Sequence, residues 1–583
     1  MKHPKIPLAQ TVIQLCKAKN IQHIVLSPGS RNAPLTIGFT HDPFFKCYSI
    51  VDERCAAFFA LGIAQQIKHP VAVVCTSGSA LLNYYPAVSE AYYSHVPLVV
   101  LSADRPKYLV GIGDGQTINQ EDVFKNHIQY SANLKQDLNP EKENAFAEDL
   151  PIMKSIENKV ERFLGLQQGI QQHNETEINK AFNIAITTQG PVHVNIPFDE
   201  PLYQMEDQLT VTPEVIPTPK PNLVSEDYNA FAEIWNNSKR KLVLVGVLAP
   251  NSVEQHYIDV LAEDESVLIL TESTSNLHHE NICPSIDKLI GALTEQELQG
   301  LQPEILLTFG GLIVSKKIKK FLRSHKPTQH WHVAINGAND TFFVLNKVFK
   351  QSINSFFQSF IPLTTSLKSE YNPFWKNQMD IRREKHAQYM GLIPFSDFKA
   401  FDVLLKSIPN QSQLQVGNSS AIRYTQLFDI NPTLDVFCNR GTSGIDGSTS
   451  TAIGAATTRD NPTIFITGDL SFFYDSNALW NNYIPENFRI VVINNEGGGI
   501  FRILPGHKNT DNFDYFFETK HHLTAKQLCD MYGFEYNTAS SESELSVALS
   551  DFYNTSKTPI LLEVFTPSRD NDAILLDYFK FVK

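Results

Sequence analysis

Short apolar runs, many of them rich in β-branched residues, alternate with longer segments of helical spacing along almost the whole chain. The apolar runs include "HIVLSPG", "VAVVCTSG", "PLVVLSAD", "KLVLVGV", "SVLIL", "ILLTFGG", "TIFITGD", "RIVVINN" and "ILLEVF". A continuous apolar run of this length is typical of a strand that is covered on both faces. Strands separated by helix-length segments indicate βαβ units and parallel sheets.

Two stretches interrupt this alternation. Residues 211–227 contain four prolines and predict an extended linker. The segment from 362 to about 394 is polar and charged and has no strand pattern, which indicates a second connection. The interruptions divide the chain into blocks of 1–205, 220–360 and 395–583. We therefore predict an α/β protein with three doubly wound domains, each built on a parallel sheet.

Composition narrows the possible partners and the compartment. The 583 residues include 49 Lys and Arg against 62 Asp and Glu, a net charge of −13 that argues against nucleic acid or an anionic membrane as the main partner. The seven cysteines are scattered without a CxxC pair, which predicts free thiols in a reducing compartment. No run approaches 18 apolar residues, and the first ten lack the apolar stretch of a signal peptide. We expect a cytoplasmic protein without a membrane segment.

The third block contains an unusual polar pattern at two strand ends. The run "TIFITGDL" ends in Gly468-Asp469, and "RIVVINNEGGG" ends in Asn494-Asn495 followed by an acid and three glycines. Ligands of open parallel sheets bind beyond the carboxyl ends of the strands. Carboxylate, amide and backbone oxygens suit Mg²⁺, and glycines allow the backbone to approach a phosphate closely. Each motif alone also fits an ordinary turn or helix cap, but their combination favours a Mg²⁺–phosphate site.

This pair of motifs resembles the thiamine diphosphate motif, in which GDG and NN are separated by a spacer. The resemblance implies that Asp469, the side chain of Asn495 and the backbone carbonyl of Gly497 hold Mg²⁺ (or Mn²⁺) against the diphosphate. The chain departs from the pattern at Leu470, which stands in place of the last glycine, and in its spacer 471–493, which is slightly short.

A thiamine diphosphate enzyme also needs a carboxylate beside N1′ of the cofactor's aminopyrimidine ring. The candidate in the first block is Glu53, in "VDERCAAFFALGIAQ", and its proposed role is catalytic. Taken alone, Asp52 and Glu53 are better explained as first-turn acids that the helix dipole favours. The diphosphate motif in the third block makes the catalytic interpretation of Glu53 the stronger one.

Several longer motifs make the resemblance narrower. They are "SPGSRNAPLT", "DERCAAFFALG", "SADRP", "VGNSSAIR", "NRGTSGIDG", "GDLSFFYDSNAL" and "NNEGGGIFRILP". The chain in these stretches resembles the 2-succinyl-5-enolpyruvyl-6-hydroxy-3-cyclohexene-1-carboxylate (SEPHCHC) synthases, thiamine diphosphate-dependent transferases of menaquinone biosynthesis. The match covers both outer blocks and is weak in the middle one. It implies a first domain that binds the pyrimidine, a central α/β domain and a third domain that binds the diphosphate.

The resemblance also implies the reaction and its partners. Members of this family decarboxylate 2-oxoglutarate and add the resulting succinic semialdehyde carbanion to isochorismate in a 1,4 fashion, with release of CO₂. Active sites in the wider superfamily lie between subunits, which implies a homodimer or homotetramer. The substrates carry several carboxylates, and arginine's planar fork is well suited to bind them.

The motif matches assign individual residues to these roles. The expected substrate-binding residues are Ser30, Arg31, Arg105, Gln116, Lys316, Lys317, Ser419, Arg423, Arg440 and Phe501. The expected cofactor-binding residues are Glu53, Ile445, Asp469, Leu470, Ser471, Asn495, Gly497 and Ile500.

Structural roles compete with some of these assignments. A salt bridge to Asp104 would equally explain Arg105, and a solvated helix face would explain Lys316 and Lys317. Core packing competes for Ile445 and Phe501. The histidine pairs 278–279 and 521–522 match no motif and receive no role.

Three other functions remain as alternatives. The first is another thiamine carboligase such as an acetolactate-synthase-like enzyme, but pyruvate has no distal carboxylate to satisfy the arginines. The second is a non-catalytic scaffold, against which the presence of Glu53 and Asp469 argues. The third is a nicotinamide oxidoreductase, but no GxGxxG joins a strand to a helix.

Overall fold

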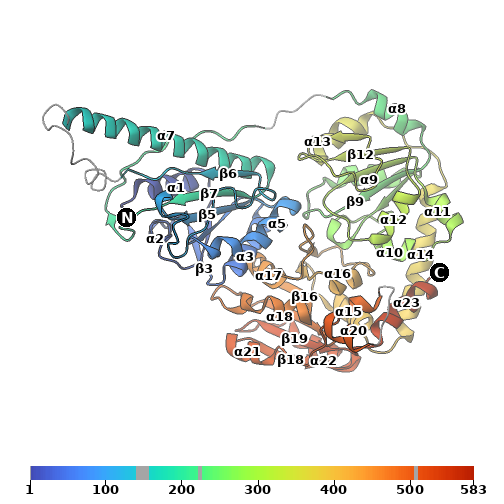
Figure 1. Cartoon of the computed structure of the whole chain (residues 1–583). Coiled ribbons are helices and arrows are strands. Elements are labelled where there is room, and N and C mark those ends of the chain that lie inside the picture. Colours follow the sequence, from blue (N-terminus) through green and yellow to red (C-terminus); the bar gives the residue numbers. More distant parts are fainter. Residues whose placement is uncertain (1, 139–155, 221–225, 504–509) are drawn as a thin grey trace. The chain divides into compact units, whose positions relative to one another are not determined.

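The computed structural model describes residues 2–138, 156–220, 226–503 and 510–583. Within these ranges the strands form three parallel sheets, plus one short antiparallel pair between β1 (His3–Pro4) and β8 (Met205–Glu206). Helices flank each parallel sheet (Figure 1). The predicted fold class, α/β with parallel doubly wound sheets, is confirmed, and the nine apolar runs quoted above all form strands.

The N-terminal sheet has the strand order β3-β2-β4-β5-β7-β6. Its strands are β2 (His23–Leu26), β3 (Lys46–Ser49), β4 (Val71–Cys75), β5 (Leu98–Asp104), β6 (Tyr130–Asn133) and β7 (Val192–Pro197). Its helices are α1 (Pro7–Ala18), α2 (Ala33–His41), α3 (Glu53–Ile67), α4 (Ser79–Asn83), α5 (Tyr85–Ser94) and α7 (Ile156–Thr188), with a 3₁₀ turn at Lys107–Leu109. The order reverses between β2 and β4, so the crevice that binds ligands in such sheets is expected beyond their carboxyl ends.

Both faces of this sheet are buried, which explains the continuous apolar runs. In β4, Ala72 and Val74 join a core that α1, α2 and α7 cover. Val71 and Val73 are buried on the opposite face, where α3 packs.

The middle sheet has the order β10-β9-β11-β12-β13. Its strands are β9 (Lys241–Val245), β10 (Val267–Leu270), β11 (Ile305–Phe309), β12 (Gln329–Val333) and β13 (Lys347–Phe349). Its helical elements are α8 (Asn229–Asn237), α9 (Gln255–Glu263), the 3₁₀ turn η2 (Ser273–Ser275), α10 (Ile286–Ile290), α11 (Glu295–Leu301), α12 (Lys316–Ser324), α13 (Ile353–Phe360) and a 3₁₀ turn at Ile361–Leu363. Alternate residues of β9 enter separate hydrophobic cores on the two faces.

The C-terminal sheet has the order β15-β14-β16-β17-β19-β18. Its strands are β14 (Gln413–Val416), β15 (Asp435–Phe437), β16 (Thr463–Gly468), β17 (Phe488–Asn494), β18 (Glu535–Ala539) and β19 (Ile560–Phe565). Its helical elements are α15 (Asp397–Ser407), α16 (Ser420–Thr425), α17 (Ser448–Ala456), α18 (Asp469–Tyr474), a 3₁₀ turn at Ser476–Leu479, α19 (Ile500–Ile503), α20 (Asp511–Phe516), α21 (Lys526–Tyr532), α22 (Glu542–Phe552) and α23 (Asn571–Phe581). The order reverses between β14 and β16, which marks a second expected crevice beyond these strands.

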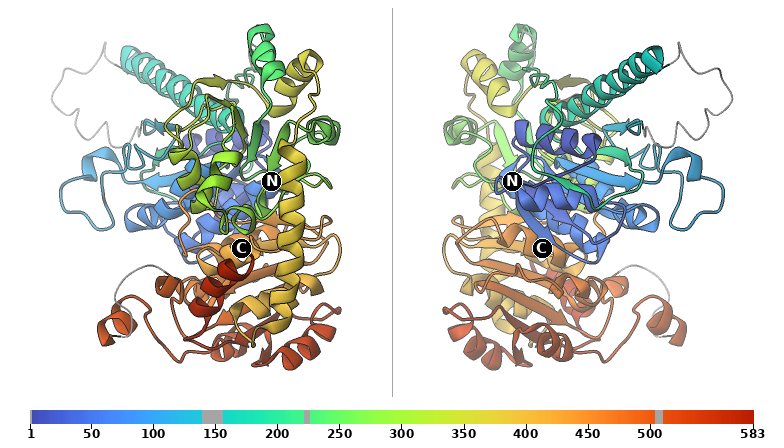
Figure 2. Two further views of the ribbon diagram at one scale, coloured as in Figure 1. Left: turned by 90° about the vertical axis from the view of Figure 1, so that its right-hand side faces the viewer. Right: turned by 90° about the vertical axis from the view of Figure 1, so that its left-hand side faces the viewer.

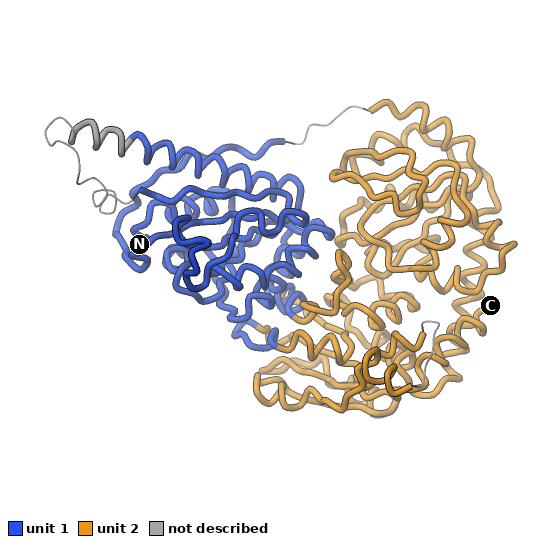
Figure 3. The backbone as a smooth tube through the Cα atoms, viewed as in Figure 1, with its two compact units in different colours: residues 1–221, 450–458, 477–483 blue, residues 222–449, 459–476, 484–583 orange. Residues whose placement is uncertain are grey.

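The chain divides into two compact units, coloured separately in Figure 3. The first contains the N-terminal sheet together with residues 450–458 and 477–483. The second contains the middle and C-terminal sheets together. Each unit is described on its own below.

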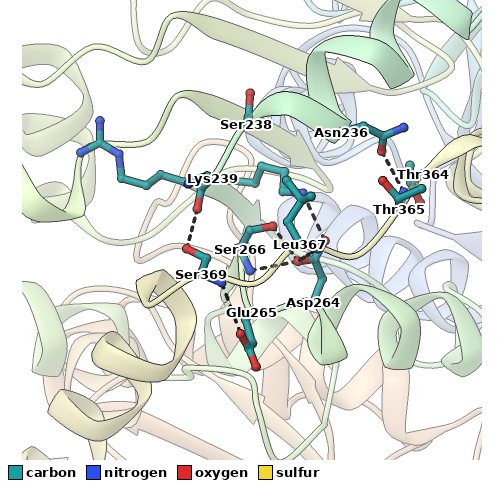
Figure 4. A network of polar contacts seen from close by, with 12 residues as sticks. Asn236, Ser238, Lys239, Asp264, Glu265, Ser266, Thr364, Thr365, Leu367 and Ser369 are labelled. Atoms are coloured by element: carbon teal, nitrogen blue, oxygen red, sulfur yellow. Dashed lines mark hydrogen bonds and ion pairs between the residues drawn. The ribbon is translucent and has the colours of Figure 1, made fainter.

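Two connections lie between the three sheets. Residues 211–220 form no helix or strand, whereas 221–225 of the predicted linker lie outside the described residues. The second connection first crosses back over the middle domain, where Thr365, Leu367 and Ser369 donate backbone hydrogen bonds to the side chains of Asn236, Asp264 and Glu265 (Figure 4).

Most of the second connection is the helix α14 (Tyr371–Leu392). Figure 2 shows it as a long yellow rod that runs from the middle domain along the C-terminal one. Trp375 and Met379, in its first half, belong to a core of the middle domain. Tyr389 and Met390, in its second half, belong to the core of the C-terminal domain. The helix therefore joins two hydrophobic cores.

All seven cysteines are free thiols, and six of them are buried. Among the described residues no helix is both long enough and apolar enough to span a bilayer.

Candidate active site

The carboxyl edge of the C-terminal sheet brings the predicted metal ligands together. Strands β16 and β17 are neighbours, with Gly468 level with Ile493, so that Asp469 and Asn495 both follow adjacent strand ends. Asp469 is 2% exposed, and its Oδ2 accepts a hydrogen bond from the backbone N–H of Gly497 at 3.0 Å. Two of the three predicted ligand residues are therefore in direct contact.

The two neighbouring asparagines have different partners. Asn494 Nδ2 donates to Glu563 Oε1 at 2.7 Å and to the carbonyl of Leu523 at 2.9 Å, which fixes β17 to its surroundings. Asn495 Nδ2 instead donates to Asp397 Oδ2 at 2.8 Å. With its nitrogen held in this way, the amide oxygen of Asn495 is available as a metal ligand.

The glycines after Asn495 leave space that a side chain would fill. Gly497 has φ +147°, and a Cβ at this position would lie 2.5 Å from the carbonyl oxygen of Glu518. Gly498 donates its N–H to the same carbonyl at 2.7 Å. The backbone therefore turns tightly beside Asp469, as a loop that approaches a phosphate must.

One carboxylate, one amide oxygen and one backbone carbonyl are hard ligands that fit Mg²⁺, whose remaining ligands in such sites are waters and phosphate oxygens. No group of three His, Cys, Asp or Glu side chains that would hold a metal occurs in the described ranges. The donor set that is present thus contains a single carboxylate.

Two residues at this edge were not predicted from the sequence. Asp397 begins α15 after the cap Ser396, so the sequence explains it as a first-turn acid. In the structure it is 2% exposed, binds Asn495 and accepts from Thr566 Oγ1 at 2.5 Å, and burial raises the pKa of its carboxyl to about 6. His521, to which no role was assigned, places Nε2 3.3 Å from Asp469 Oδ2, and that carboxylate raises the pKa of the imidazole. Neither residue belongs to a recognisable motif, so only the folded structure reveals them.

The remaining predicted cofactor residues surround this edge. Leu470 and Ser471 lie in the first turn of α18, and Ser471 Oγ donates to the carbonyl of Ile445 at 2.7 Å. Ile445 is 36% exposed, and Phe501, in α19 next to Ile500, is 37% exposed. Neither side chain is enclosed in the hydrophobic core, so both are accessible to a ligand.

Three cationic side chains gather in the second unit. Arg440 donates from Nη1 to Asn418 Oδ1 at 2.8 Å. Burial lowers the pKa of Arg423, and the charge of Arg440 lowers it further. Burial also lowers the pKa of Lys319, to which the charges of both arginines contribute. Mutual repulsion of this kind marks a site that an anion would stabilise.

Ser419 precedes Arg423 in a strained turn. It has φ +67° and ψ −123°, a conformation that non-glycine residues rarely adopt and that often occurs at ligand sites.

The two lysines predicted to bind substrate, Lys316 and Lys317, have surroundings different from those of the clustered cations. Lys316 is exposed at the start of α12. Lys317 Nζ lies 3.0 Å from the ring centroid of Phe579, and burial lowers its pKa to about 8. Lys319, which was not predicted, also lies in α12 and interacts electrostatically with both arginines.

The other polar residues predicted to bind substrate lie in the first unit, after the carboxyl ends of its strands. Arg31 is 3% exposed and donates to the carbonyl of Phe198 at 3.0 Å. Burial lowers its pKa, with a further contribution from the charge of Arg105. Arg105 Nη2 donates to the carbonyl of Gly115 at 3.0 Å, and its Nη1 lies 3.8 Å from Asp114 Oδ2, so its ion pair is with Asp114 and not with the predicted Asp104. Ser30 is exposed beside Arg31.

Gln116 is exposed on a loop that a buried network supports. Ser77 Oγ donates to the Gln116 carbonyl at 3.0 Å, and Gln120 Oε1 accepts from the N–H of Gly78 at 2.9 Å. Gln120 Nε2 donates to Asn195 Oδ1 at 2.8 Å.

The two acids at the start of α3 have separate roles. Asp52 is the helix cap, because its Oδ1 accepts from the N–H of Cys55 at 3.2 Å. Glu53 is half-buried, and its Oε2 accepts from Asn83 Nδ2 at 3.3 Å. The helix cap is thus provided by Asp52, which leaves Glu53 for another function.

Close packing fixes this helix in place. A Cβ on Gly62 of α3 would lie 2.1 Å from the carbonyl oxygen of Thr451, and a Cβ on Gly454 would lie 2.0 Å from that of Phe59. Residues 450–458 belong to the same unit as α3.

Three family models of thiamine pyrophosphate enzymes match successive parts of the chain. The N-terminal TPP binding domain of thiamine pyrophosphate enzymes matches residues 6–130, the middle domain matches 225–414, and the C-terminal TPP binding domain matches 415–564. The 2-succinyl-5-enolpyruvyl-6-hydroxy-3-cyclohexene-1-carboxylate synthase of Flavobacterium psychrophilum is 54% identical over 580 residues, covering 100% of both chains.

The synthases of the same name from two other organisms are also similar. That of Christiangramia forsetii is 55% identical over 590 residues, covering 100% of both chains, and that of Bacteroides thetaiotaomicron is 36% identical over 585 residues, covering 98% of both. The predicted family is confirmed: the chain belongs to the 2-succinyl-5-enolpyruvyl-6-hydroxy-3-cyclohexene-1-carboxylate synthases, within the thiamine pyrophosphate enzymes.

Proposed function

We propose that the chain decarboxylates 2-oxoglutarate, releasing CO₂, and adds the resulting four-carbon unit to isochorismate by 1,4-addition. The new C–C bond gives SEPHCHC, an intermediate of menaquinone biosynthesis. Thiamine diphosphate and Mg²⁺ (or Mn²⁺) are the proposed cofactors. The observation that carries the proposal is the edge of the C-terminal sheet, where buried Asp469 contacts the Gly497 turn and Asn495 is oriented by Asp397.

When bound, thiamine diphosphate supplies the nucleophilic carbon and accepts the electrons that CO₂ leaves behind. The residues of the chain hold and activate it. Asp469, Asn495 and the Gly497 carbonyl would hold the metal, and Leu470 and Ser471, in the first turn of α18, would contribute to binding the diphosphate. Glu53 would hydrogen-bond N1′ of the pyrimidine and hold a proton there. Ile445 and Ile500 provide apolar surface for the cofactor.

The cationic residues bind the substrate carboxylates. Arg423, Arg440 and Ser419 are the proposed contacts in the C-terminal domain. In the N-terminal domain they are Ser30, Arg31, Arg105 and Gln116. Lys316, Lys317 and Phe501 remain proposed substrate contacts from the family resemblance. Desolvated carboxylates need such partners, and pyruvate would leave part of this set unpaired, which disfavours the acetolactate-synthase-like alternative.

We further propose that the domains span 1–205, 220–360 and 395–583, and that the enzyme is a cytoplasmic homodimer or homotetramer with active sites between subunits. In this arrangement the N-terminal domain of one subunit provides Glu53 and the C-terminal domain of another holds the diphosphate.

A turnover assay with 2-oxoglutarate and isochorismate tests the proposed function. We expect CO₂ release and loss of isochorismate only when thiamine diphosphate and Mg²⁺ are present. Turnover of pyruvate in preference to 2-oxoglutarate, or no carboligation with isochorismate, would contradict the assignment.

We expect Arg423→Ala to weaken substrate use without affecting the cofactor. Loss of one charged hydrogen bond to a carboxylate predicts a KM for its substrate that is about 10- to 100-fold higher. The Kd of thiamine diphosphate, measured by calorimetry, is expected to stay within about twofold, since no diphosphate contact is removed. Arg459→Ala, which removes a cation paired with Asp435 at 2.6 Å instead, serves as the control. Equal losses of substrate and cofactor binding in Arg423→Ala would assign this arginine to the diphosphate.

A further inference from the structure

A short buried segment of the middle domain contacts the start of α12, the end of α16 and the strand β15, which carry or lead to the clustered cations of the second unit. It consists of residues 272–276, which follow β10 and include the turn η2. Glu272 is 3% exposed and Asn276 is 9% exposed. None of these residues belongs to a motif noted in the sequence, and the proposed chemistry does not use them.

Glu272 fixes the start of α12. Its Oε2 accepts from the N–H of Val314 at 2.7 Å, and its Oε1 accepts from the N–H of Ser315 at 2.8 Å. Ser315 in turn caps α12, since its Oγ accepts from the N–H of Ile318 at 3.1 Å. A charged acceptor of two backbone N–H groups is a strong anchor. It sets the position of the helix that carries Lys319.

Asn276 fixes the strand that leads to Arg440. Its Nδ2 donates to the carbonyl of Val436 at 2.9 Å, and its Oδ1 accepts from the N–H of the same residue at 2.8 Å. Val436 lies in β15, the edge strand of the C-terminal sheet. The side chain of Asn276 thus satisfies backbone groups of an edge strand, in the way that a neighbouring strand would.

The segment also reaches the helix that carries Arg423. The N–H of Ser273 donates to Gln426 Oε1 at 3.3 Å, and Gln426 follows the last residue of α16. One segment of five residues therefore contacts α12, α16 and β15.

The charges are consistent with this placement. Glu272 interacts with Arg440, Arg423 and Lys319, and also faces the like charge of Asp287. Burial raises the pKa of the Glu272 carboxyl to about 7, against the opposing effect of its two backbone donors.

We propose that the segment 272–276 sets the geometry in which Lys319, Arg423 and Arg440 meet the carboxylates of the substrates, with Glu272 and Asn276 as positioning residues. Lys319 thereby becomes a further cation of the carboxylate-binding group. This inference rests on the proposed function, because it assumes that the clustered cations bind dicarboxylate substrates.

Steady-state kinetics of the full-length enzyme test the positioning role. Glu272→Gln keeps the shape of the side chain but leaves only one oxygen as acceptor, whereas Glu272→Ala removes both hydrogen bonds. We expect KM for the affected substrate to rise about 5-fold in Glu272→Gln and at least about 30-fold in Glu272→Ala, with a Kd for thiamine diphosphate within about twofold of wild type. Thr274→Val is the matched control, because Thr274 is fully buried in the same segment and its hydroxyl has no hydrogen-bond partner.

A second pair of variants avoids the buried segment. Lys319→Gln is expected to raise the same KM about 10-fold, whereas Lys320→Gln, on the exposed part of the same helix, leaves it unchanged. The inference is overturned if both Glu272 and Lys319 variants keep the wild-type KM. It is also overturned if the Glu272 variants lose cofactor and substrate binding in parallel, as a purely structural defect would cause. An inactive wild-type enzyme in this assay would refute the proposed function instead.

Discussion

Glu53→Gln is expected to bind thiamine diphosphate but to lose turnover almost completely. Glutamine preserves the shape of the side chain and accepts from Asn83 as glutamate does at 3.3 Å. It cannot hold a proton at N1′ of the pyrimidine, and a positioned acid or base of this kind contributes about 10²- to 10⁴-fold to rate. We therefore expect kcat for CO₂ release to fall by about that factor. The Kd of thiamine diphosphate, measured by calorimetry, is expected to change by about threefold or less.

The neighbouring acid provides the control for this variant. Asp52→Asn makes the same chemical change one residue earlier, at the helix cap. Asparagine is as good a cap as aspartate, so folding and turnover are expected to persist. Near-normal turnover in Glu53→Gln would exclude Glu53 as the activating carboxylate.

Asp469→Ala is expected to abolish Mg²⁺-dependent binding of the cofactor. Asp469 is the single carboxylate of the proposed metal site, and it also accepts from the Gly497 turn. Removal of residues that merely support metal ligands typically costs 10–100-fold in affinity, so loss of a ligand is expected to raise the Kd of thiamine diphosphate by about 100-fold or more. Calorimetry in the presence of Mg²⁺, and again with a chelator, measures the Kd of thiamine diphosphate with and without the metal.

Two further variants separate charge from structure in this experiment. Asp469→Asn keeps an acceptor for the N–H of Gly497 but removes the charge, and we expect it to lose most of the Mg²⁺ dependence. Glu496→Gln alters a nearby acid, between Asn495 and Gly497, whose Oε1 lies 3.1 Å from Nδ1 of His522. We expect this variant to bind the cofactor normally. An unchanged Kd in Asp469→Ala would remove the metal role of this residue.

The sequence predicted many interior strands because both of their faces are buried, but it did not predict the interior strands β7, β12 and β14, whose sequences contain polar residues. Strands β4, β9 and β17 are continuous apolar runs for this reason. Several edge strands gave no such pattern, although the edge strand β10 did. In β18 ("EYNTA") only the last residue is fully buried, and β3 ("KCYS") has exposed residues at both ends. An edge strand that is partly solvated does not need an apolar sequence, so periodicity alone cannot detect it.

The candidate site likewise contains residues that the sequence predicted and residues that it did not. Motif residues such as Asp469 and Glu53 are visible because chemistry requires their type and spacing. Asp397, His521 and Glu272 act through contacts with residues far away in the sequence, 98 positions in the case of Asp397 and Asn495. Their local sequence fits a helix start, a polar loop and a strand end. The position of such residues depends on tertiary structure, which a single sequence does not specify locally.

Lys319 is a more specific example. The family resemblance assigns the basic position of the middle domain to Lys316 and Lys317, and this assignment stays a prediction. In the folded chain Lys317 packs against Phe579, and Lys319 interacts with Arg423 and Arg440. Lys316 and Lys319 are three positions apart and lie on the same side of α12, whereas Lys317 lies on a different side, so the anchoring of α12 decides which lysines face the site.

The most direct test of the central claim is a crystal structure of the assembled enzyme with thiamine diphosphate and Mg²⁺. We predict one metal ion bound by Asp469, the Asn495 side chain and the Gly497 carbonyl, with the diphosphate completing its coordination. The pyrimidine of the same cofactor molecule should place N1′ within hydrogen-bonding distance of a Glu53 carboxylate from a neighbouring subunit. A cofactor bound without contact to Asp469, or with N1′ facing a residue other than Glu53, would contradict the account.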